Sequence, residues 1–524
     1  METDTIIIGN GPSAMILSYI LHGNIPYYSS QHPHPDPLLH AKLQRAPALL
    51  GNDVVALTEH FSASRLSYST QALPINVLLD TLVCPSVDIE ELQSVTNLEW
   101  RHEPERAVPH RVLGNTPRPG GQWTENRMPA SWEIQTLSYA SMLSLPGYSF
   151  AEHYRKTTGK DLPPYTRPSR QETADYFRSY PEAVGIDDAF YSNENVWGVS
   201  RDSQGFVLQS HNIRCKHLVL ASGIFSEILQ PPSLLSPLSS LEPVQETPLL
   251  VIGSGFSAAD VIISAPENQK IIHVFKWDPE NRPSPLRGCH QHAYPEYAGV
   301  YRLMRRAAVA AKPKSTKRAK PLRTTSSAFL ESRSWESVYE GLANTEIIDV
   351  QMHEEDATVI FRRPDGTTFP RQIRGMVYAT GRRGTLDYLD QSLLREVIPN
   401  DGTTEVNPTI TGQTLRGKAI ENVEVAKDVF IIGSLTGDSL IRFSYGSCVQ
   451  AAGKLIDAFT GNEAKSIPAT VARPEQTIGV MRGIDGHDVY ANNVSYCSGH
   501  HSMALGAENK APKGIWTWLM GIWR

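Results

Sequence analysis

Two short glycine-rich segments have the residue types that could hold a phosphate group. Residues 5–14 read TIIIGNGPSA and residues 249–258 read LLVIGSGFSA, so each has a GxGxxA turn directly after an apolar run. Such a run has the length of a buried parallel strand, and the apolar residues at 15–21 and 259–264 predict a helix after each turn. A helix N-terminus offers free N–H groups to a pyrophosphate. The repeat therefore predicts two dinucleotide-binding units.

The residue types of the turn have separate physical purposes. The first glycine permits the tight turn, the second lets the backbone approach a pyrophosphate, and the alanine keeps helix and strand close. One such turn is weak evidence, whereas two copies after apolar strands favour dinucleotide binding. The residues predicted to bind phosphate are Gly9, Gly11, Pro12, Ser13 and Ala14 in the first turn, and Gly253, Ser254, Gly255, Phe256, Ser257 and Ala258 in the second.

The residues expected to hold the ribose differ between the two units. An acidic residue is expected about 20 residues after the turn. After Gly11 that window, residues 27–31, reads YYSSQ, so either a serine takes the ribose or the acid is displaced. In the second unit, the strand 271–275 is followed by Lys276, with Arg282 beyond it, and these suit the 2′-phosphate of NADP(H). Asp278 lies in the same segment, and Lys276 could simply be a solvated side chain. NADH therefore stays open as the alternative nucleotide.

The remaining motifs predict how the chain is organised. Residues 217–224 (HLVLASGI) and 375–382 (GMVYATGR) are apolar strands that end in Ala-Ser/Thr-Gly, where the chain is expected to cross between units. A third strand and turn at 429–438 is expected to precede a helix near 446–459. The sequence predicts an α/β fold with two Rossmann-like dinucleotide-binding domains, the second inserted into the first. The predicted boundaries are 1–245 and 391–510 for the first domain, 246–390 for the second, and 511–524 for a C-terminal tail.

Composition excludes several classes of protein. The chain has 524 residues with a net charge of −6, which argues against nucleic-acid binding. Five cysteines without a CxxC pair, and histidine pairs near 32–34 and 290–292 without a third ligand, predict no disulfide framework and no metal site. No signal peptide and no run of about 18 apolar residues are evident, so a cytoplasmic protein without a transmembrane segment is expected.

In motif order, the sequence resembles the two-dinucleotide-binding flavoprotein monooxygenases. The matching features are the GxGxxA turn at Gly9, GGQW at 120–123, GxGxSA at Gly253, ATG at 379–381 and the Gly437-Asp438 pair. More narrowly, GNGPS, HPHP, PGGQW, YPEY and GDSLIRF resemble the oxidative stress-induced growth inhibitor family. An FxGxxxH signature, typical of better-known monooxygenases, is absent between the nucleotide motifs.

The resemblance implies FAD on the first turn and NADPH on the second. Further cofactor contacts are implied for Gly120, Gly121, Gln122, Trp123, Thr380, Gly381, Gly437 and Asp438, with Asp438 near the flavin ribityl or pyrophosphate, and with a helix cap as the alternative for Asp438. Arg442 and Tyr445 follow Asp438 closely and are expected to reach the active face of the flavin as catalytic residues, with a structural role for both as the alternative. The implied reaction is an NADPH- and O2-dependent oxygenation of a small organic substrate through a flavin (hydro)peroxide, by heteroatom hydroxylation or Baeyer–Villiger-type insertion, typical of secondary metabolism.

Two other functions stay open: a flavin-binding regulatory protein with little turnover, and a flavin oxidase or isomerase without net oxygenation. The basic stretch 302–323 is expected to be a solvated surface. The tail, which carries Trp516, Trp518 and Trp523, is expected to pack on the protein, with membrane or partner docking as the alternative.

Overall fold

The first apolar run forms a central strand of the larger of two parallel sheets. In the computed structural model, β1 (Glu2–Ile8) pairs in parallel with β4 (His110–Leu113) on one side and with β8 (Ile213–Leu220) on the other. The sheet continues through β5 (Phe190–Tyr191) beside β4 and through β19 (Val429–Ile431) beside β8. Three antiparallel strands complete it: β6 (Val199–Asp202), β7 (Gly205–Leu208) and β18 (Glu424–Ala426).

The second apolar run forms a central strand of the smaller parallel sheet. Its order is β12 (Tyr339–Ala343), β11 (Ile271–Phe275), β10 (Leu249–Ile252) and β16 (Gly375–Tyr378). One face packs on helices, and the other packs on a separate antiparallel sheet. The helices are α8 (Phe256–Ser264), α9 (Pro295–Ala310), α10 (Ala328–Glu331) and α11 (Trp335–Val338), and the antiparallel strands are β13 (Glu346–Met352), β14 (Ala357–Arg362) and β15 (Thr368–Ile373).

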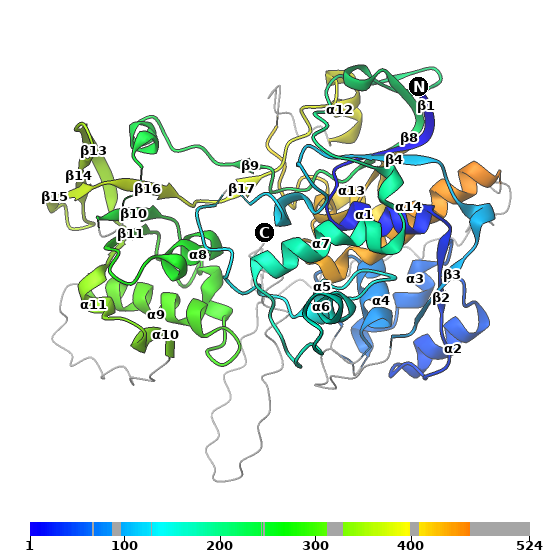
Figure 1. The fold of residues 1–524 in the computed structure, drawn as a ribbon, viewed down its shortest axis with the longest axis horizontal. Helices are drawn as coiled ribbons and strands as arrows, with labels where there is room; N and C mark the ends of the chain where they lie inside the picture. Colours follow the sequence, from blue (N-terminus) through cyan, green and yellow to red (C-terminus); the bar gives the residue numbers. More distant parts are fainter. Residues whose placement is uncertain are drawn as a thin grey trace, which may run out of the picture.

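The chain passes from the larger sheet to the smaller one and back. It leaves after β8 and returns after β16, so the strands predicted at 217–224 and 375–382 are confirmed. Between the lobes, β9 (Glu227–Ile228) pairs antiparallel with β17 (Arg382–Arg383). Figure 1 shows these two short strands between the lobe of β10–β16 and the lobe that contains β1. The structure describes residues 1–64, 66, 68–85, 96–126, 128–242, 244, 247–311, 328–398 and 408–461.

The helix after the first turn is buried on every side. In α1 (Pro12–Leu21) all residues from Ala14 to Leu21 are buried, which its apolar sequence permits. It packs against α14 (Tyr445–Thr460), which in turn packs against α4 (Pro74–Val83). The helices predicted at 15–21, 259–264 and 446–459 are therefore confirmed as α1, α8 and α14.

The segment that follows α1 leaves the larger sheet. Strand β2 (Asn24–Tyr28) pairs antiparallel with β3 (Leu98–His102), and neither joins β1. The strand beside β1 is instead β4, which the chain reaches only after residues 22–109. The other helices of this lobe are α2 (Pro37–Arg45), α3 (Val54–Thr58), α5 (Ala140–Leu143), α6 (Phe150–Thr158), α7 (Arg170–Val184), α12 (Gln391–Val397) and α13 (Arg416–Glu421).

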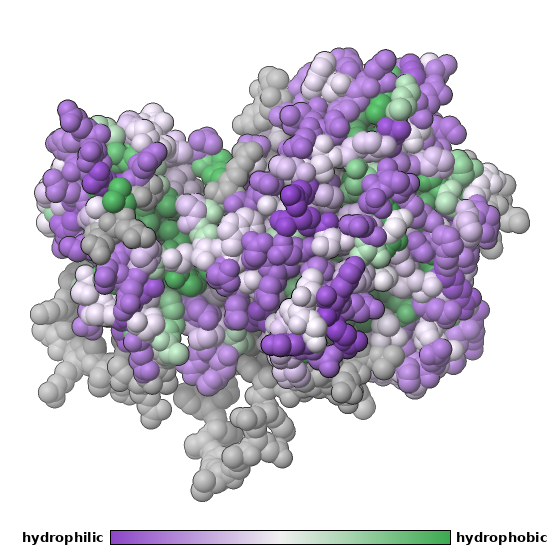
Figure 2. Space-filling model, viewed as in Figure 1, coloured by the Kyte–Doolittle hydropathy of each residue, from purple (hydrophilic) through white to green (hydrophobic). Residues whose placement is uncertain are grey.

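The visible surface is mostly polar. Figure 2 shows hydrophilic residues over most of both lobes, with hydrophobic residues in small separate patches. Among the described helices, none has both the length and the apolar character that crossing a membrane requires.

Candidate functional site

The two glycine turns are built in the same way. Gly9 has φ +113° and Gly253 has φ +146°, values that L side chains rarely adopt. A Cβ on Gly9 would lie within 3.0 Å of the carbonyl of Ala221, and a Cβ on Gly253 would lie equally close to the carbonyl of Ala379. Ala221 and Ala379 are the alanines of the two Ala-Ser/Thr-Gly segments. Each glycine therefore lets the end of a neighbouring strand, β8 in the first unit and β16 in the second, approach the turn closely.

The second glycine of each turn faces open space. Gly11 precedes α1 and Gly255 precedes α8, and neither helix has a side chain that caps its first turn. A Cβ on Gly11 would meet no atom within 4 Å, and the nearest atom to one on Gly255 is Pro285 Cγ at 3.8 Å. Uncapped N–H groups and the positive end of the helix dipole are suited to an anion. Both turns therefore have the geometry of phosphate sites.

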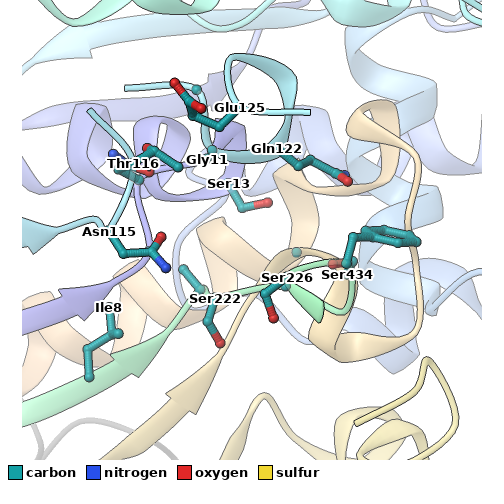
Figure 3. Close-up of a pocket in the computed structure, with 18 of the residues that line it drawn as sticks. Ile8, Gly11, Ser13, Asn115, Thr116, Gln122, Glu125, Ser222, Ser226 and Ser434 are labelled. Carbon is teal, nitrogen blue, oxygen red and sulfur yellow. Dashed lines mark hydrogen bonds between the residues drawn. The ribbon is translucent and has the colours of Figure 1, made fainter. Parts of the chain in front are cut away.

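A cavity of about 500 Å³ lies in front of the first turn. Figure 3 shows Gly11 and Ser13 near its middle, Asn115 toward one end, and Gln122 and Ser434 toward the other. Most of the residues predicted to contact the first nucleotide line it: Gly9, Gly11, Pro12, Ser13, Gly120, Gly121, Gln122 and Trp123. Other lining residues were not predicted as site residues, among them Asn115, Thr116, Glu194, Ser222, Ser226, Arg382, Gly433 and Ser434.

The GGQW segment lies directly on the first turn. The Gly120 N–H donates to the carbonyl of Asn10 at 2.9 Å. A Cβ on Gly121, which has φ +57°, would stand 3.3 Å from Gly11 Cα. Trp123 packs against Phe177 of α7 with ring centroids 5.8 Å apart. The structure thus brings the two predicted glycine segments together in one wall of the cavity.

The segment after β19 reaches the cavity with different residues from those predicted. Gly433 and Ser434 line the cavity, whereas Gly437 and Asp438 do not. Gly433 has φ +64°, and a Cβ there would lie within 3.0 Å of Ser13 Oγ. The signal that could have identified this pair is local, because Ile431-Ile432-Gly433-Ser434 repeats the strand-to-glycine pattern of the first two turns.

The carboxylate of Asp438 is bound by other groups of the protein. Its side chain is buried, and its carboxylate accepts hydrogen bonds from the Leu73 N–H at 2.8 Å and Asn76 Nδ2 at 2.7 Å. It also forms an ion pair with Arg416 at 2.6 Å. A buried carboxylate needs such donors to stay charged. Asp438 therefore joins the loops before α4 and α14, in contrast to the predicted flavin contact, and α14 begins only at Tyr445.

The structure does not bring the predicted catalytic residues to the cavity. Arg442 forms two hydrogen bonds with the carboxylate of Asp80, at 2.7 and 2.5 Å. The hydroxyl of Tyr445 donates to the carbonyl of Ser144 at 2.8 Å, and burial raises the pKa of Tyr445 well above its usual value. Both side chains connect parts of the fold, so we assign no catalytic role to them.

A buried histidine supports the second turn. His273, in the middle of β11, approaches the carbonyl of Gly253 with Nε2 at 2.7 Å and the hydroxyl of Tyr339 with Nδ1 at 2.8 Å. Burial lowers the pKa of His273 to about 4, so the ring is neutral at pH 7. The arrangement fits Nε2–H donating to Gly253 and Nδ1 accepting from Tyr339. A histidine inside an apolar strand was the available sequence signal.

The basic residues predicted for the second nucleotide follow β11. Lys276 and Arg282 are exposed, and the Arg282 N–H donates to the carbonyl of Asp278 at 3.0 Å, which closes the loop between them. Because β11 lies beside β10, this loop stands next to the second turn. Thr380 and Gly381 lie between β16 and β17 and do not line the cavity at the first turn.

The remaining sequence predictions concern residues outside the two glycine turns. The window at 27–31, searched for a ribose-binding acid, begins in β2 and does not line the cavity. Among the described residues, no group of three His, Cys, Asp or Glu side chains could hold a metal ion. Helix α9 contains the first part of the basic stretch, Arg302–Ala310. Residues 312–327, the tail with its tryptophans, and Cys497 lie outside the described residues.

The chain is similar in sequence to curated proteins and in fold to solved structures. No established protein-family profile matches the chain. "Oxidative stress-induced growth inhibitor 1" of Mus musculus is 27% identical over 500 residues, which cover 86% of this chain and 94% of the relative. A solved flavin-containing monooxygenase from Stenotrophomonas maltophilia is 13% identical to this chain, and the match covers 88% of this chain and 99% of that protein with a TM-score of 0.46.

A human relative is more similar to this chain over a shorter stretch. "Oxidative stress-induced growth inhibitor 2" of Homo sapiens is 30% identical over 361 residues, which cover 57% of this chain and 68% of the relative. This identity agrees with the motif order that the sequence shows from its first glycine turn to its last. The chain therefore belongs to the oxidative stress-induced growth inhibitor family.

Proposed function

We propose that this protein is an FAD-dependent, NADPH-using monooxygenase that oxygenates a small organic substrate. The observation that carries the proposal is the pair of uncapped helix N-termini behind equivalent glycine turns, the first of which opens on a cavity of about 500 Å³. A cavity of this size is in the range of cofactor sites. We also propose that residues 246–390 form the NADPH domain, inserted into an FAD domain of residues 1–245 and 391–510.

The first turn fits the pyrophosphate of FAD. Gly11 has room where a side chain would stand, and the N–H groups at the start of α1 are free of a side-chain cap. The only basic side chain in the described cavity wall is Arg382, so backbone N–H groups would provide most of the phosphate contacts. The GGQW segment and Gly433-Ser434 would hold the flavin half, at the side of the cavity where Gln122 and Ser434 lie in Figure 3.

The second turn, Lys276 and Arg282 would hold NADPH. His273 would keep the carbonyl of Gly253 oriented so that the turn retains its shape with or without the nucleotide. When bound, the flavin would accept hydride from the nicotinamide and react with O2, chemistry that no amino-acid side chain provides. The chain's own part is to orient both cofactors and to place the substrate.

The names of the relatives favour a regulatory protein as the alternative function. The relatives are named growth inhibitors, and these names state no enzymatic activity. A flavin-binding regulatory protein with little turnover would use the same cavity without consuming substrate. A flavin oxidase or isomerase without net oxygenation would bind the same cofactor.

The test is to purify the protein and measure its flavin content, its reduction by NADPH without oxygen, and O2 uptake with candidate substrates. We expect bound FAD, bleaching of its 450 nm absorbance by NADPH, and a product that is one oxygen atom heavier than its substrate. NADPH-reducible FAD with no oxygenated product from any substrate would support the regulatory or oxidase alternatives. Absence of FAD after reconstitution would refute the cofactor assignment.

A further inference from the structure

The strand next to the glycine turn differs between the two units. In the second unit, β11 follows α8 and pairs with β10, so residue 276 stands beside the turn. In the first unit, the strand after α1 is β2, which pairs with β3 away from β1. The strand beside β1 is β4, with Ile8 opposite Leu113. In such folds the ribose of the adenosine half is held just beyond the end of this neighbouring strand. The position that normally carries the acid is therefore 114, not 27–31.

Residue 114 is a glycine, and the structure leaves no room for a side chain there. A Cβ on Gly114 would lie within 3.0 Å of the side chain of Asn10. Asn10 is buried, and its side-chain oxygen accepts from Thr116 Oγ1 at 3.0 Å. Its Nδ2 donates to the carbonyl of Arg118 at 3.3 Å. Asn10 thus occupies the space of the usual acid and fixes the loop that follows β4.

An acid stands one strand further along the same edge. β5 lies beside β4, and the Gly114 N–H donates to the carbonyl of Tyr191 at 3.0 Å. The Glu194 N–H then donates to the carbonyl of Gly114 at 2.9 Å. These two bonds hold the backbone of Glu194 against residue 114. Glu194 lines the cavity, as does Asn115, which Figure 3 places at the end away from Gln122 and Ser434.

The carboxylate of Glu194 is oriented and has one oxygen available. His211 Nε2 lies 2.8 Å from Glu194 Oε2, and the Ser210 hydroxyl contacts the other ring nitrogen of His211 at 2.6 Å. Among the described residues, Oε1 of Glu194 has no hydrogen-bond partner. The side chain is 36% exposed, so a ligand in the cavity can reach it.

We propose that Glu194, together with Asn115, binds the ribose hydroxyls of the adenosine half of FAD in place of the acid that residue 114 lacks. This inference rests on the proposed FAD site and adds its specificity for the adenosine half. A carboxylate that accepts from a ribose hydroxyl forms a charge-assisted hydrogen bond, which is stronger than a neutral one. Three other acids line the cavity wall: Glu125 follows the GGQW segment, whereas Glu227 in β9 and Asp387 after β17 belong to the segments that connect the lobes.

The test is flavin binding to the apoprotein, followed by flavin fluorescence, for the wild type and for Glu194→Ala, Glu194→Gln, Asp387→Asn and the control Glu182→Gln, an exposed position on α7 outside the cavity wall. We expect Glu194→Ala to raise the Kd for FAD about 10- to 100-fold, the range of one hydrogen bond to a charged group. The Kd for FMN, which lacks the adenosine, should stay unchanged, and Glu182→Gln should bind both flavins as the wild type does. With an FAD analogue that contains 2′-deoxyadenosine, the difference between wild type and Glu194→Ala should shrink.

The results separate this inference from the proposed function. If the wild type binds FAD tightly and both Glu194 variants bind it equally well, the inference is wrong and the FAD site stands. An equal loss of FAD and FMN in Glu194→Gln would also overturn the ribose assignment. A larger loss of FAD affinity in Asp387→Asn than in Glu194→Ala would assign the ribose to Asp387. If the wild type binds no FAD, the proposed function itself fails.

Discussion

Two glycines of the same turn should respond to substitution in opposite ways. Gly11 has φ −77°, which any L-residue adopts, and a side chain there would enter the cavity without meeting protein. We expect Gly11→Val to cost only about 0.5–1 kcal/mol of stability as a poorer N-cap, or roughly 0.5–1 °C in melting temperature. Because its two methyl groups would fill the space of the pyrophosphate, FAD affinity should fall at least about 100-fold.

Gly9→Ala should instead damage the fold. Gly9 has φ +113°, and the new Cβ would lie within 3.0 Å of the Ala221 carbonyl. A left-handed conformation costs about 1–2 kcal/mol, and overpacking costs about 1–3 kcal/mol. The sum, about 2–5 kcal/mol, corresponds to a fall of roughly 2–5 °C in melting temperature for a chain of 524 residues. Gly51→Ala is the matched control, because Gly51 has φ +75° but no atom within 4 Å of a Cβ, and it should lose only the first contribution.

The assay is thermal unfolding of the three apoproteins, followed by FAD titration of each. Unfolding must be measured without FAD, because a ligand that binds only the native state raises the melting temperature. Wild-type FAD affinity in Gly11→Val would refute the assignment of the pyrophosphate to this turn. A melting temperature of Gly9→Ala no lower than that of Gly51→Ala would refute the argument from the Ala221 contact.

Three further outcomes are expected. Lys276→Ala should raise the KM for NADPH about tenfold and leave the KM for NADH unchanged, because it removes one charge-assisted contact. The control is Lys270→Ala, just before β11, and an equal effect of both variants would refute the 2′-phosphate assignment. Asp438→Ala should lose about 3–5 kcal/mol of stability, because it removes the carboxylate that pairs with Arg416. The FAD content per folded molecule should stay normal. Loss of FAD at an unchanged melting temperature would instead support a cofactor contact for Asp438. Burial lowers the pKa of His273 from 6.5 to about 4, so its unfolded form binds the proton first as pH falls. Wild-type stability in urea should therefore fall by about 1.4 kcal/mol more per pH unit between pH 6.5 and 4 than that of His273→Gln, and parallel pH profiles would contradict this.

The sequence alone predicted the elements whose physics is local. An apolar run, a glycine turn and a helix start lie within about ten residues of one another at Gly9 and at Gly253, so their conformation depends mainly on neighbours in the chain. The helix after β19 and the two strands that end in Ala-Ser/Thr-Gly were predicted for the same reason. These local signals were sufficient to indicate two nucleotide-binding units and the residues of both turns.

Only the tertiary structure decided which distant residues meet. The strand after α1 pairs with β3 rather than with β1, which moves the ribose position from 27–31 to the end of β4. Arg442 pairs with Asp80, and Asp438 with the loop before α4, more than 300 positions away in the chain. Such pairings depend on the packing of whole strands and helices, because a charged side chain that becomes buried must find a partner wherever the fold supplies one. No spacing within one segment of the sequence contains that information.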